Sequence, residues 1–262
     1  MVSIETAKLG DFLRTLGAHV HESLELFGRA HIARGRGAFA VAPIEKGEVL
    51  LRLPRAAVVC ACENGSECDW MPEAVRAMSP VVRTALWLMH EDALGAASAW
   101  APYCSSLPRE YDTLEHWTQH ELGELRGTSV YDALARLRDK RGDLVGPATV
   151  LWEKEVHAIV RDSPGLWPDA SLASFLRACA AVRTRGFFDL AADGAGGPYM
   201  LPAMDMLNHA RERTATSLMV VRGATEARAP TKAPAAERSS LVFSMRAERD
   251  IAPGEEIVHT YD

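Results

Sequence analysis

The chain has 262 residues, a formal net charge of −6 and an apolar fraction of 48%. This length is ample for a buried core, in one large domain or two small ones. The negative charge provides no overall positive field for nucleic acid, and no apolar run approaches the roughly 18 residues that a membrane helix needs. We therefore expect a globular monomer that binds neither nucleic acid nor membrane.

The cysteines bear on the compartment and on metal binding. The chain has five of them, an odd number, and its opening residues lack the apolar core of a signal peptide. This combination predicts reduced thiols in an intracellular compartment, cytoplasmic or nuclear, with the chloroplast still open. Cys60, Cys62 and Cys68 form a cluster that could hold zinc, but structural zinc sites need four ligands. We expect free thiols and no metal, with zinc as the alternative.

The first predicted elements are short β-strands. Residues 38–41 are apolar and are followed by Pro43, which ends the run. Residues 49–53 follow a Lys-Gly turn and end at Pro54. Residues 58–59 predict the start of a third strand.

Residues 72–182 have a helical character. Ser79 before Pro80 is typical of an N-cap followed by the first helical position, and apolar residues then recur at helical spacing. A second apolar stripe begins at Leu172, and the pattern of residues 131–137 predicts a third helix. The order of strands, then helices, then strands argues against a doubly wound sheet.

Strand patterns return near the end of the chain. Residues 217–221 and 241–245 are apolar strand candidates that could pair as a long hairpin. The intervening residues 222–240 are rich in Ala, Pro, Thr and charge, which predicts an exposed, mobile inserted loop. Residues 44–49 resemble residues 251–256, and we interpret the echo as one glycine turn used twice.

Two segments of the second strand region carry a specific motif. Residues 202–209 read Pro-Ala-Met-Asp-Met-Leu-Asn-His, and residues 254–261 read Gly-Glu-Glu-Ile-Val-His-Thr-Tyr. In this order they resemble the SET-domain protein methyltransferases, in particular the subgroup of the plant Rubisco large-subunit lysine methyltransferase. The other segments that carry the resemblance are residues 34–40, 100–108, 117–128 and 184–187.

The resemblance implies an α+β fold in which a β-rich SET core of several short sheets is interrupted by a mainly helical insert. The core would occupy residues 20–69 and 183–262, and the insert residues 70–182. Family members continue past the motif tyrosine into a C-terminal domain that holds the substrate, whereas this sequence stops one residue after Tyr261.

The resemblance also implies a chemistry, the transfer of a methyl group from S-adenosylmethionine (AdoMet) to a lysine of a protein substrate, here a non-histone protein. Deprotonating an unperturbed lysine at neutral pH costs about 4.6 kcal/mol, which a dry channel would lower. Tyr261 is the expected catalytic residue, because a phenol oxygen can orient the amine and accept contacts from the transferring methyl group.

By the same resemblance, several residues are expected to bind the cofactor. The amide of Asn208 offers donors and acceptors to an adenine edge, and Arg185 could pair with the carboxylate of the cofactor. Gly37 would let the backbone approach closely, with Arg36 contributing its backbone. The full predicted set is Arg36, Gly37, Arg185, Asp205, Asn208 and His209.

Three alternatives stay open. A relative in the subgroup methylates histidine, and its cofactor motifs would look the same. A SET-like binding module with impaired catalysis is the second alternative, because the chain ends just after Tyr261. A zinc-dependent structural protein built on the cysteine cluster is the third.

Overall fold

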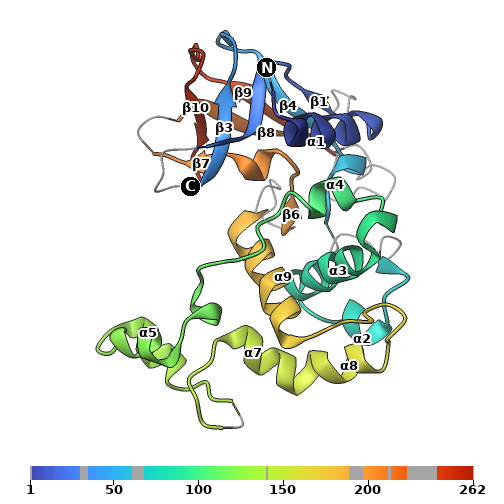
Figure 1. Ribbon diagram of the computed structural model, residues 1–262, viewed down its shortest axis with the longest axis vertical. Coiled ribbons are helices and arrows are strands. Elements are labelled where there is room, and N and C mark those ends of the chain that lie inside the picture. Colours follow the sequence, from blue (N-terminus) through green and yellow to red (C-terminus); the bar gives the residue numbers. More distant parts are fainter. Residues whose placement is uncertain are drawn as a thin grey trace. The chain divides into compact units, whose positions relative to one another are not determined.

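The computed structural model describes residues 2–29, 35–60, 68–139, 141–188, 197–211, 214–222 and 241–261. The chain divides into two compact units, which we call the β unit and the helical unit (Figure 1). The β unit comprises Met1–Cys60 and Gly186–Asp262, and the helical unit comprises Ala61–Arg185. Cys62 and the loop predicted after Arg222 lie outside the described residues.

The β unit holds three small sheets. Their strand orders are β1-β4-β9-β8, β2-β3-β10-β7 and β5-β6. Together with the helices of the other unit, they confirm the predicted α+β class. The elements of the β unit are α1 (Ile4–Thr15), β1 (His19–Val20), β2 (Leu24–Arg29), β3 (Arg36–Ala40), β4 (Val49–Pro54), β5 (Gly186–Phe187), β6 (Tyr199–Met200), β7 (Asn208–His209), β8 (Thr216–Arg222), β9 (Leu241–Ala247) and β10 (Glu256–His259).

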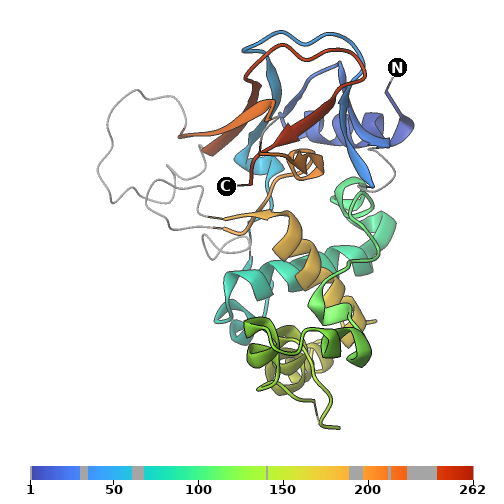
Figure 2. The ribbon, with the colours of Figure 1, turned by 90° about the vertical axis from the view of Figure 1, so that its left-hand side faces the viewer.

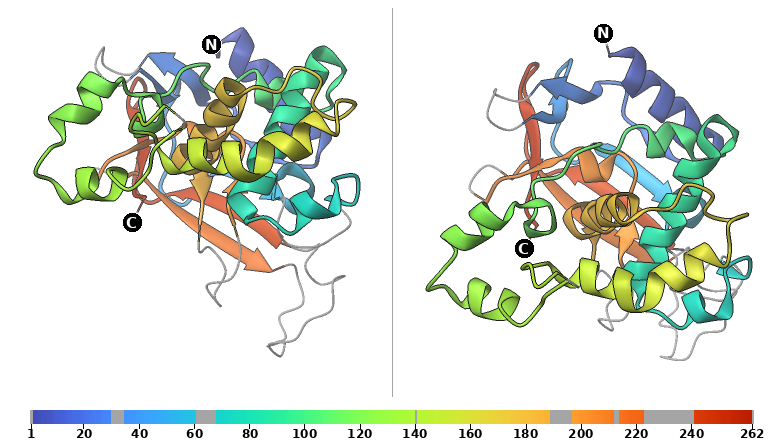
Figure 3. Two further views of the ribbon diagram at one scale, coloured as in Figure 1. Left: turned by 90° about the horizontal axis from the view of Figure 1, so that it is seen from below. Right: turned by 60° about the horizontal axis from the view of Figure 1, so that its bottom comes forward.

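The longest strand pair is the predicted hairpin of β8 and β9 (Figure 3). The two strands are antiparallel, with Thr216 opposite Ala247 at one end and Arg222 opposite Leu241 at the other. Successive strand residues point to opposite faces, so Phe243 and Met245 enter the core together, and both are fully buried. Burial of this face fixes the register of the sheet that supports the rest of the unit.

The echo between residues 44–49 and 251–256 is a structural equivalence. Ile44 and Ile251 exchange both backbone hydrogen bonds, at 3.1 and 2.9 Å. The Gly47 N–H donates to the Ala247 carbonyl and the Gly254 N–H donates to the Ala40 carbonyl, each at 2.7 Å. Both glycines have φ values in the left-handed region, 91° and 80°. One turn geometry is therefore used twice, at positions separated by a constant offset.

Two parts of the β unit differ from the sequence prediction. The strand predicted at residues 58–59 is a 3-10 turn at Arg55–Ala57 followed by an isolated bridge from Val59 to Met200. Strand β2 and helix α1 were not predicted, and a buried carboxylate of β2 anchors the helix. Glu25 of β2 accepts hydrogen bonds from the hydroxyls of Ser3 and Thr6, at 2.8 and 2.6 Å, beside the helix N-terminus.

The helical unit is organised around α3 and α9, which pack side by side (Figures 2 and 3). Both helices have buried apolar residues, among them Leu86 of α3 and Phe175 of α9. The helices of this unit are α2 (Glu73–Arg76), α3 (Pro80–Leu94), α4 (Ala101–Cys104), α5 (Gln119–Glu124), α6 (Ser129–Leu134), α7 (Pro147–Leu151), α8 (His157–Arg161) and α9 (Leu172–Arg185), with a π-helical turn at Trp152–Val156.

Two helix predictions need correction. Helix α3 begins at Pro80 as predicted, but Ser79 holds its N-cap position without a side-chain hydrogen bond to the helix among the described residues. The helix predicted at residues 131–137 ends at Leu134, because the chain then turns back to bridge Arg138 with Leu144. This return places Leu134 in a small apolar cluster with Leu122 and Leu144.

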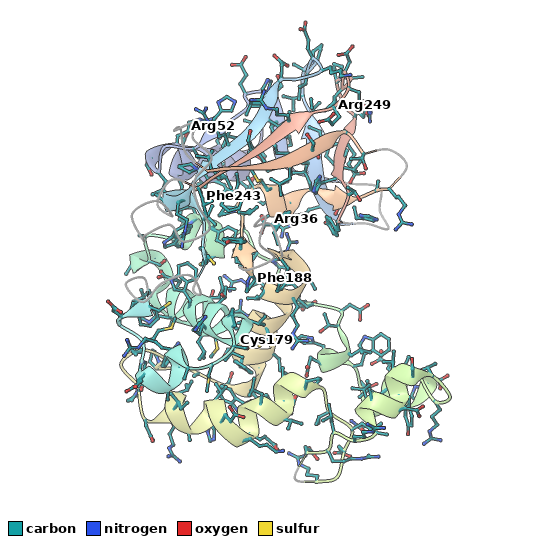
Figure 4. All side chains as sticks on the ribbon, turned by 180° about the vertical axis from the view of Figure 1, so that it is seen from behind. Arg36, Arg52, Cys179, Phe188, Phe243 and Arg249 are labelled. Atoms are coloured by element: carbon teal, nitrogen blue, oxygen red, sulfur yellow. The ribbon has the colours of Figure 1, made fainter. Side chains whose placement is uncertain are left out.

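Two buried thiols of the helical unit have raised pKa values. Cys179 lies on α9 (Figure 4), and burial raises the pKa of its thiol to about 12. Burial likewise raises the pKa of Cys104 to about 12, with further elevation from Glu91 and Asp92. Within the part of the chain that the structure describes, no group of three or more His, Cys, Asp or Glu residues could hold a metal ion. In the same described ranges, no helix is long and apolar enough to cross a bilayer.

Candidate active site

Three adjacent strands bring the two motifs together. Strand β10 pairs antiparallel with β3, placing Ile257 opposite Ala38, and parallel with β7, placing Val258 opposite Asn208 (Figure 1). Because β10 lies between the other two, segments near residues 36, 208 and 256 share one region of the sheet. Arg36 lies at the end of this sheet away from the turn that carries Arg249 (Figure 4).

Asn208 is held by two acceptors. Its Nδ2 donates to the backbone carbonyl of Arg36 at 3.1 Å and to Oε1 of Glu256 at 2.7 Å. A Cβ on Gly37 would lie 2.8 Å from each of Asn208 Nδ2 and Glu256 Oε1, closer than real Cβ contacts allow. A side chain at position 37 would displace the Asn208–Glu256 pair, so the lack of a Cβ on Gly37 permits this arrangement.

Glu256 belongs to the site although the sequence interpretation gave it no role. The signal that could have identified it is the second acidic residue of the Gly-Glu-Glu motif, which starts a strand otherwise made of buried residues. Ile257 and Val258 follow it and are buried. A half-buried carboxylate at the start of such a strand needs a hydrogen-bond donor, and Asn208 supplies one.

Tyr261 is fixed against the Leu207–His209 segment by three contacts. Its hydroxyl donates to the Leu207 carbonyl at 2.7 Å, and its backbone N–H donates to Nδ1 of His209 at 3.1 Å. The two rings lie 5.0 Å apart between centroids. Since the phenol proton is engaged, the oxygen keeps its lone pairs as acceptors. The tyrosine ring itself is 61% exposed.

The His209 side chain contacts Tyr261, and the cofactor contact that the resemblance implies for this residue stays a prediction. Its Nδ1 accepts a hydrogen bond, so this nitrogen carries no proton, and the imidazole is turned toward Tyr261. The backbone of His209 pairs with β10 and continues to Ala210, whose N–H donates to the His259 carbonyl at 3.1 Å. The side chain of His209 therefore contacts Tyr261.

A second histidine lies beside it in the sheet. His259 is opposite His209 in register and is buried, with Nδ1 3.1 Å from the Thr216 hydroxyl. Burial lowers the pKa of His259, and the neighbouring His209 lowers it further, although Thr216 acts in the opposite direction. His259 is therefore a neutral core residue that supports β10.

Asp205 follows a strained residue. Ala203 has φ 71° and ψ −38°, a region that alanine rarely occupies, and is fully buried. The chain then forms a 3-10 turn, Met204–Met206, in which the Asp205 N–H donates to the Leu201 carbonyl at 3.0 Å. Asp205 is buried in this turn, just ahead of Asn208.

The remaining predicted residues differ in location. Arg36 contributes its carbonyl to Asn208, and its guanidinium lies 5.4 Å from the centre of the Phe27 ring. Arg185 is the last residue of α9 and belongs to the helical unit, whereas the other predicted site residues belong to the β unit. Its pairing with a cofactor carboxylate stays a prediction.

The comparisons with known proteins define the class. The family model of the SET domain matches residues 35–262, and the chain belongs to this family. The Rubisco large subunit N-methyltransferase of Nicotiana tabacum is 26% identical over 239 residues, which cover 88% of this chain and 43% of the relative. The N-lysine methyltransferase SETD6 of Rattus norvegicus is 27% identical, over 90% of this chain and 47% of the relative.

Other relatives refine this picture. The actin-histidine N-methyltransferase of Drosophila melanogaster is 29% identical, but over 49% of this chain and 23% of the relative. The fold resembles the SET domain of LSMT bound to lysine and AdoHcy, with a TM-score of 0.70 and 19% identity over 98% of this chain and 54% of that one. The chain spans about half the length of the curated N-lysine relatives that it matches.

Proposed function

We propose that the chain is the catalytic region of an AdoMet-dependent protein-lysine N-methyltransferase. The observation that carries the proposal is the proximity of Asn208 and His209 on β7 to Tyr261, two residues after β10, in a chain of the SET family. The relatives named as lysine methyltransferases, and the similar fold of a protein solved with AdoMet, support the same reaction.

The residues fit a cofactor with an adenosine and an amino-acid end. Gly37 permits close backbone approach, Asn208 has an oxygen that its Nδ2 contacts do not use, and His209 would contribute to the cofactor site beside it. Arg36 and Asp205 complete the predicted set in the β unit, and Arg185 would pair with the carboxylate of the cofactor. When bound, AdoMet supplies a methyl group on a cationic sulfur.

Tyr261 would act on the nucleophile. The lysine ammonium would lose a proton to water, so that its lone pair could accept the methyl group that bound AdoMet supplies, with S-adenosylhomocysteine as the other product. The Tyr261 oxygen, with its proton engaged by Leu207, can accept a hydrogen bond from the amine and orient it. Holding the two reacting atoms in line contributes several kcal/mol to lowering the barrier.

The acceptor is a protein side chain, and the relatives' names favour non-histone lysines, such as those of Rubisco and fructose-bisphosphate aldolase. The actin-histidine relative makes histidine the second candidate. We further propose that the enzyme is an intracellular monomer, cytoplasmic, nuclear or chloroplastic, that engages no nucleic acid.

The test is transfer of a radiolabelled methyl group from AdoMet to a panel of purified proteins that includes Rubisco and actin. Acid hydrolysis and mass spectrometry of the labelled product then identify the modified residue. Methyllysine is expected. Methylhistidine would replace the lysine proposal with the histidine one, and AdoMet binding without transfer to any protein would favour a binding module.

A further inference from the structure

Glu256 and Asn208 form a hydrogen-bonded pair that the resemblance to the SET family did not predict. We propose that Glu256 is a positioning residue: it fixes the orientation of the Asn208 amide so that Asn208 presents only Oδ1, a hydrogen-bond acceptor, to the bound cofactor. The identity of the cofactor in this inference rests on the proposed function. The orientation of the Asn208 amide does not depend on it.

The orientation follows from the two neighbours of the amide. Oε1 of Glu256 and the Arg36 carbonyl lie 2.7 and 3.1 Å from Nδ2, and both can only accept hydrogen bonds. A flipped amide would place Oδ1 against two acceptors and lose both hydrogen bonds. The two amide protons are therefore both used within the protein, and the assignment of nitrogen and oxygen follows from the network.

The packing prevents the pair from relaxing. Glu256 precedes Ile257, which is fully buried and paired with Ala38 of β3, so the strand cannot shift without disturbing the core. On the other side, the ends of both side chains lie against Gly37, where an added Cβ would be 2.8 Å from Asn208 Nδ2 and from Glu256 Oε1. The hydrogen bond from Nδ2 to a carboxylate is also stronger than one between neutral groups.

The consequence is a specific kind of recognition. An asparagine free to rotate could donate to ring nitrogens or accept from amines, as the sequence suggested for an adenine edge. With Nδ2 engaged, Asn208 can accept only, so its partner on the cofactor must be a hydrogen-bond donor: an ammonium, an aromatic amine or a ribose hydroxyl. A carboxylate or a bare ring nitrogen would be rejected at this position.

The orientation can be measured without cofactor. In the ¹⁵N-labelled protein, the Asn208 side-chain amide, assigned by its loss in Asn208→Ala, should show slow hydrogen exchange. Glu256→Ala should remove this protection, and the matched control Glu45→Gln, at an exposed glutamate of the same unit, should leave it intact. Unchanged exchange in a folded Glu256→Ala protein would overturn the proposal.

The effect on binding is measured by calorimetry with S-adenosylhomocysteine. Glu256→Ala should weaken its affinity about tenfold or more, the loss expected for a charge-assisted hydrogen bond, while Glu45→Gln should not. Glu256→Gln should lose less, because its amide oxygen can still accept from Nδ2. Equal losses for the alanine and glutamine variants, with unchanged melting temperatures, would contradict a role through hydrogen bonding.

A double-mutant cycle separates positioning from a structural role. Asn208→Asp alone places a carboxylate against Glu256 and should weaken binding strongly. Adding Glu256→Gln should recover part of the affinity, because glutamine can donate to the new carboxylate. Additive losses in the double variant would overturn the proposal. If the wild-type protein does not bind S-adenosylhomocysteine, the proposed function fails, and the exchange experiment still decides the orientation of Asn208.

Discussion

The two equivalent turns of the β unit share a backbone and differ in the strand that each one enters. After each glycine comes a glutamate whose Oε2 accepts a backbone N–H three residues back, at 2.8 Å for Glu48 and 3.0 Å for Glu255. Gly47 leads into β4 and Gly254 leads into β10, and each strand has a fully buried residue at the same offset, Leu50 and Ile257.

The side chains of the two strands are of different kinds. Val49 of β4 corresponds in offset to Glu256 of β10, and the exposed Arg52 corresponds to the buried His259 (Figure 4 labels Arg52). The first strand is a core element of the β1-β4-β9-β8 sheet, while the second carries the Asn208 partner and leads to Tyr261. The turn geometry provides the same start for both strands. The strand that begins with a polar residue, Glu256, is the one that contributes to the candidate active site.

The largest expected difference between the two strands concerns Tyr261, which only β10 leads to. We expect Tyr261→Phe to lower the rate of methyl transfer by about a hundredfold, since it removes the oxygen that orients the amine. AdoMet affinity should be nearly unchanged, because the ring and the backbone N–H to His209 remain. Single-turnover rates and calorimetry measure the two effects, with Tyr131→Phe in the helical unit as the control. Full activity of Tyr261→Phe would remove Tyr261 from the mechanism.

Paired substitutions of the two turn glycines test whether the turns are equivalent. Gly47→Ala and Gly254→Ala should each reduce the free energy of unfolding by about 1–2 kcal/mol, the penalty for a left-handed backbone in a residue with a Cβ. Neither added Cβ would meet a neighbour within 4 Å, so the loss is due to the backbone alone. Denaturant titration measures it. Losses that differ by more than about 1 kcal/mol would show that the two turns are not equivalent.

The smallest expected effect is on the pH dependence of the free energy of unfolding, and it concerns His259, the counterpart of Arg52. Burial lowers the pKa of His259 from its ordinary value of 6.5, so the unfolded chain binds a proton more readily than the folded one. Its contribution to stability is complete above pH 6.5 and is lost as the pH falls toward the folded pKa. Unfolding free energies at pH 7.5 and 5.5 should differ less in His259→Asn than in wild type. Arg52→Gln, which leaves His259 in place, should keep the wild-type difference; an unchanged difference in His259→Asn would contradict the account.

The sequence predicts local patterns in this chain better than long-range contacts. The hairpin of β8 and β9 follows from apolar runs, and the start of α3 follows from Pro80. Strand β2 and helix α1 were missed because they depend on Glu25, whose hydroxyl partners lie about twenty residues away in sequence. Local spacing carries no record of such a contact.

The candidate site shows the same limit. The resemblance to the SET family named Asn208, His209 and Tyr261, and the structure places all three on β7 and just after β10. It could not assign Glu256 or the turn of the His209 ring toward Tyr261, since both depend on which strands are neighbours in the sheet. Composition and periodicity indicate that a strand exists, but the partner of a strand is set by the packing of the whole unit.

The most direct test of the central claim, that β7 and β10 build a cofactor site, is titration of AdoMet into the wild-type protein and into Asn208→Ala. The account predicts that the wild type binds and that the variant, with an unchanged melting temperature, binds at least about tenfold more weakly. Equal affinities would place the cofactor elsewhere, and no binding by the wild type would contradict the assignment of this region as the cofactor site.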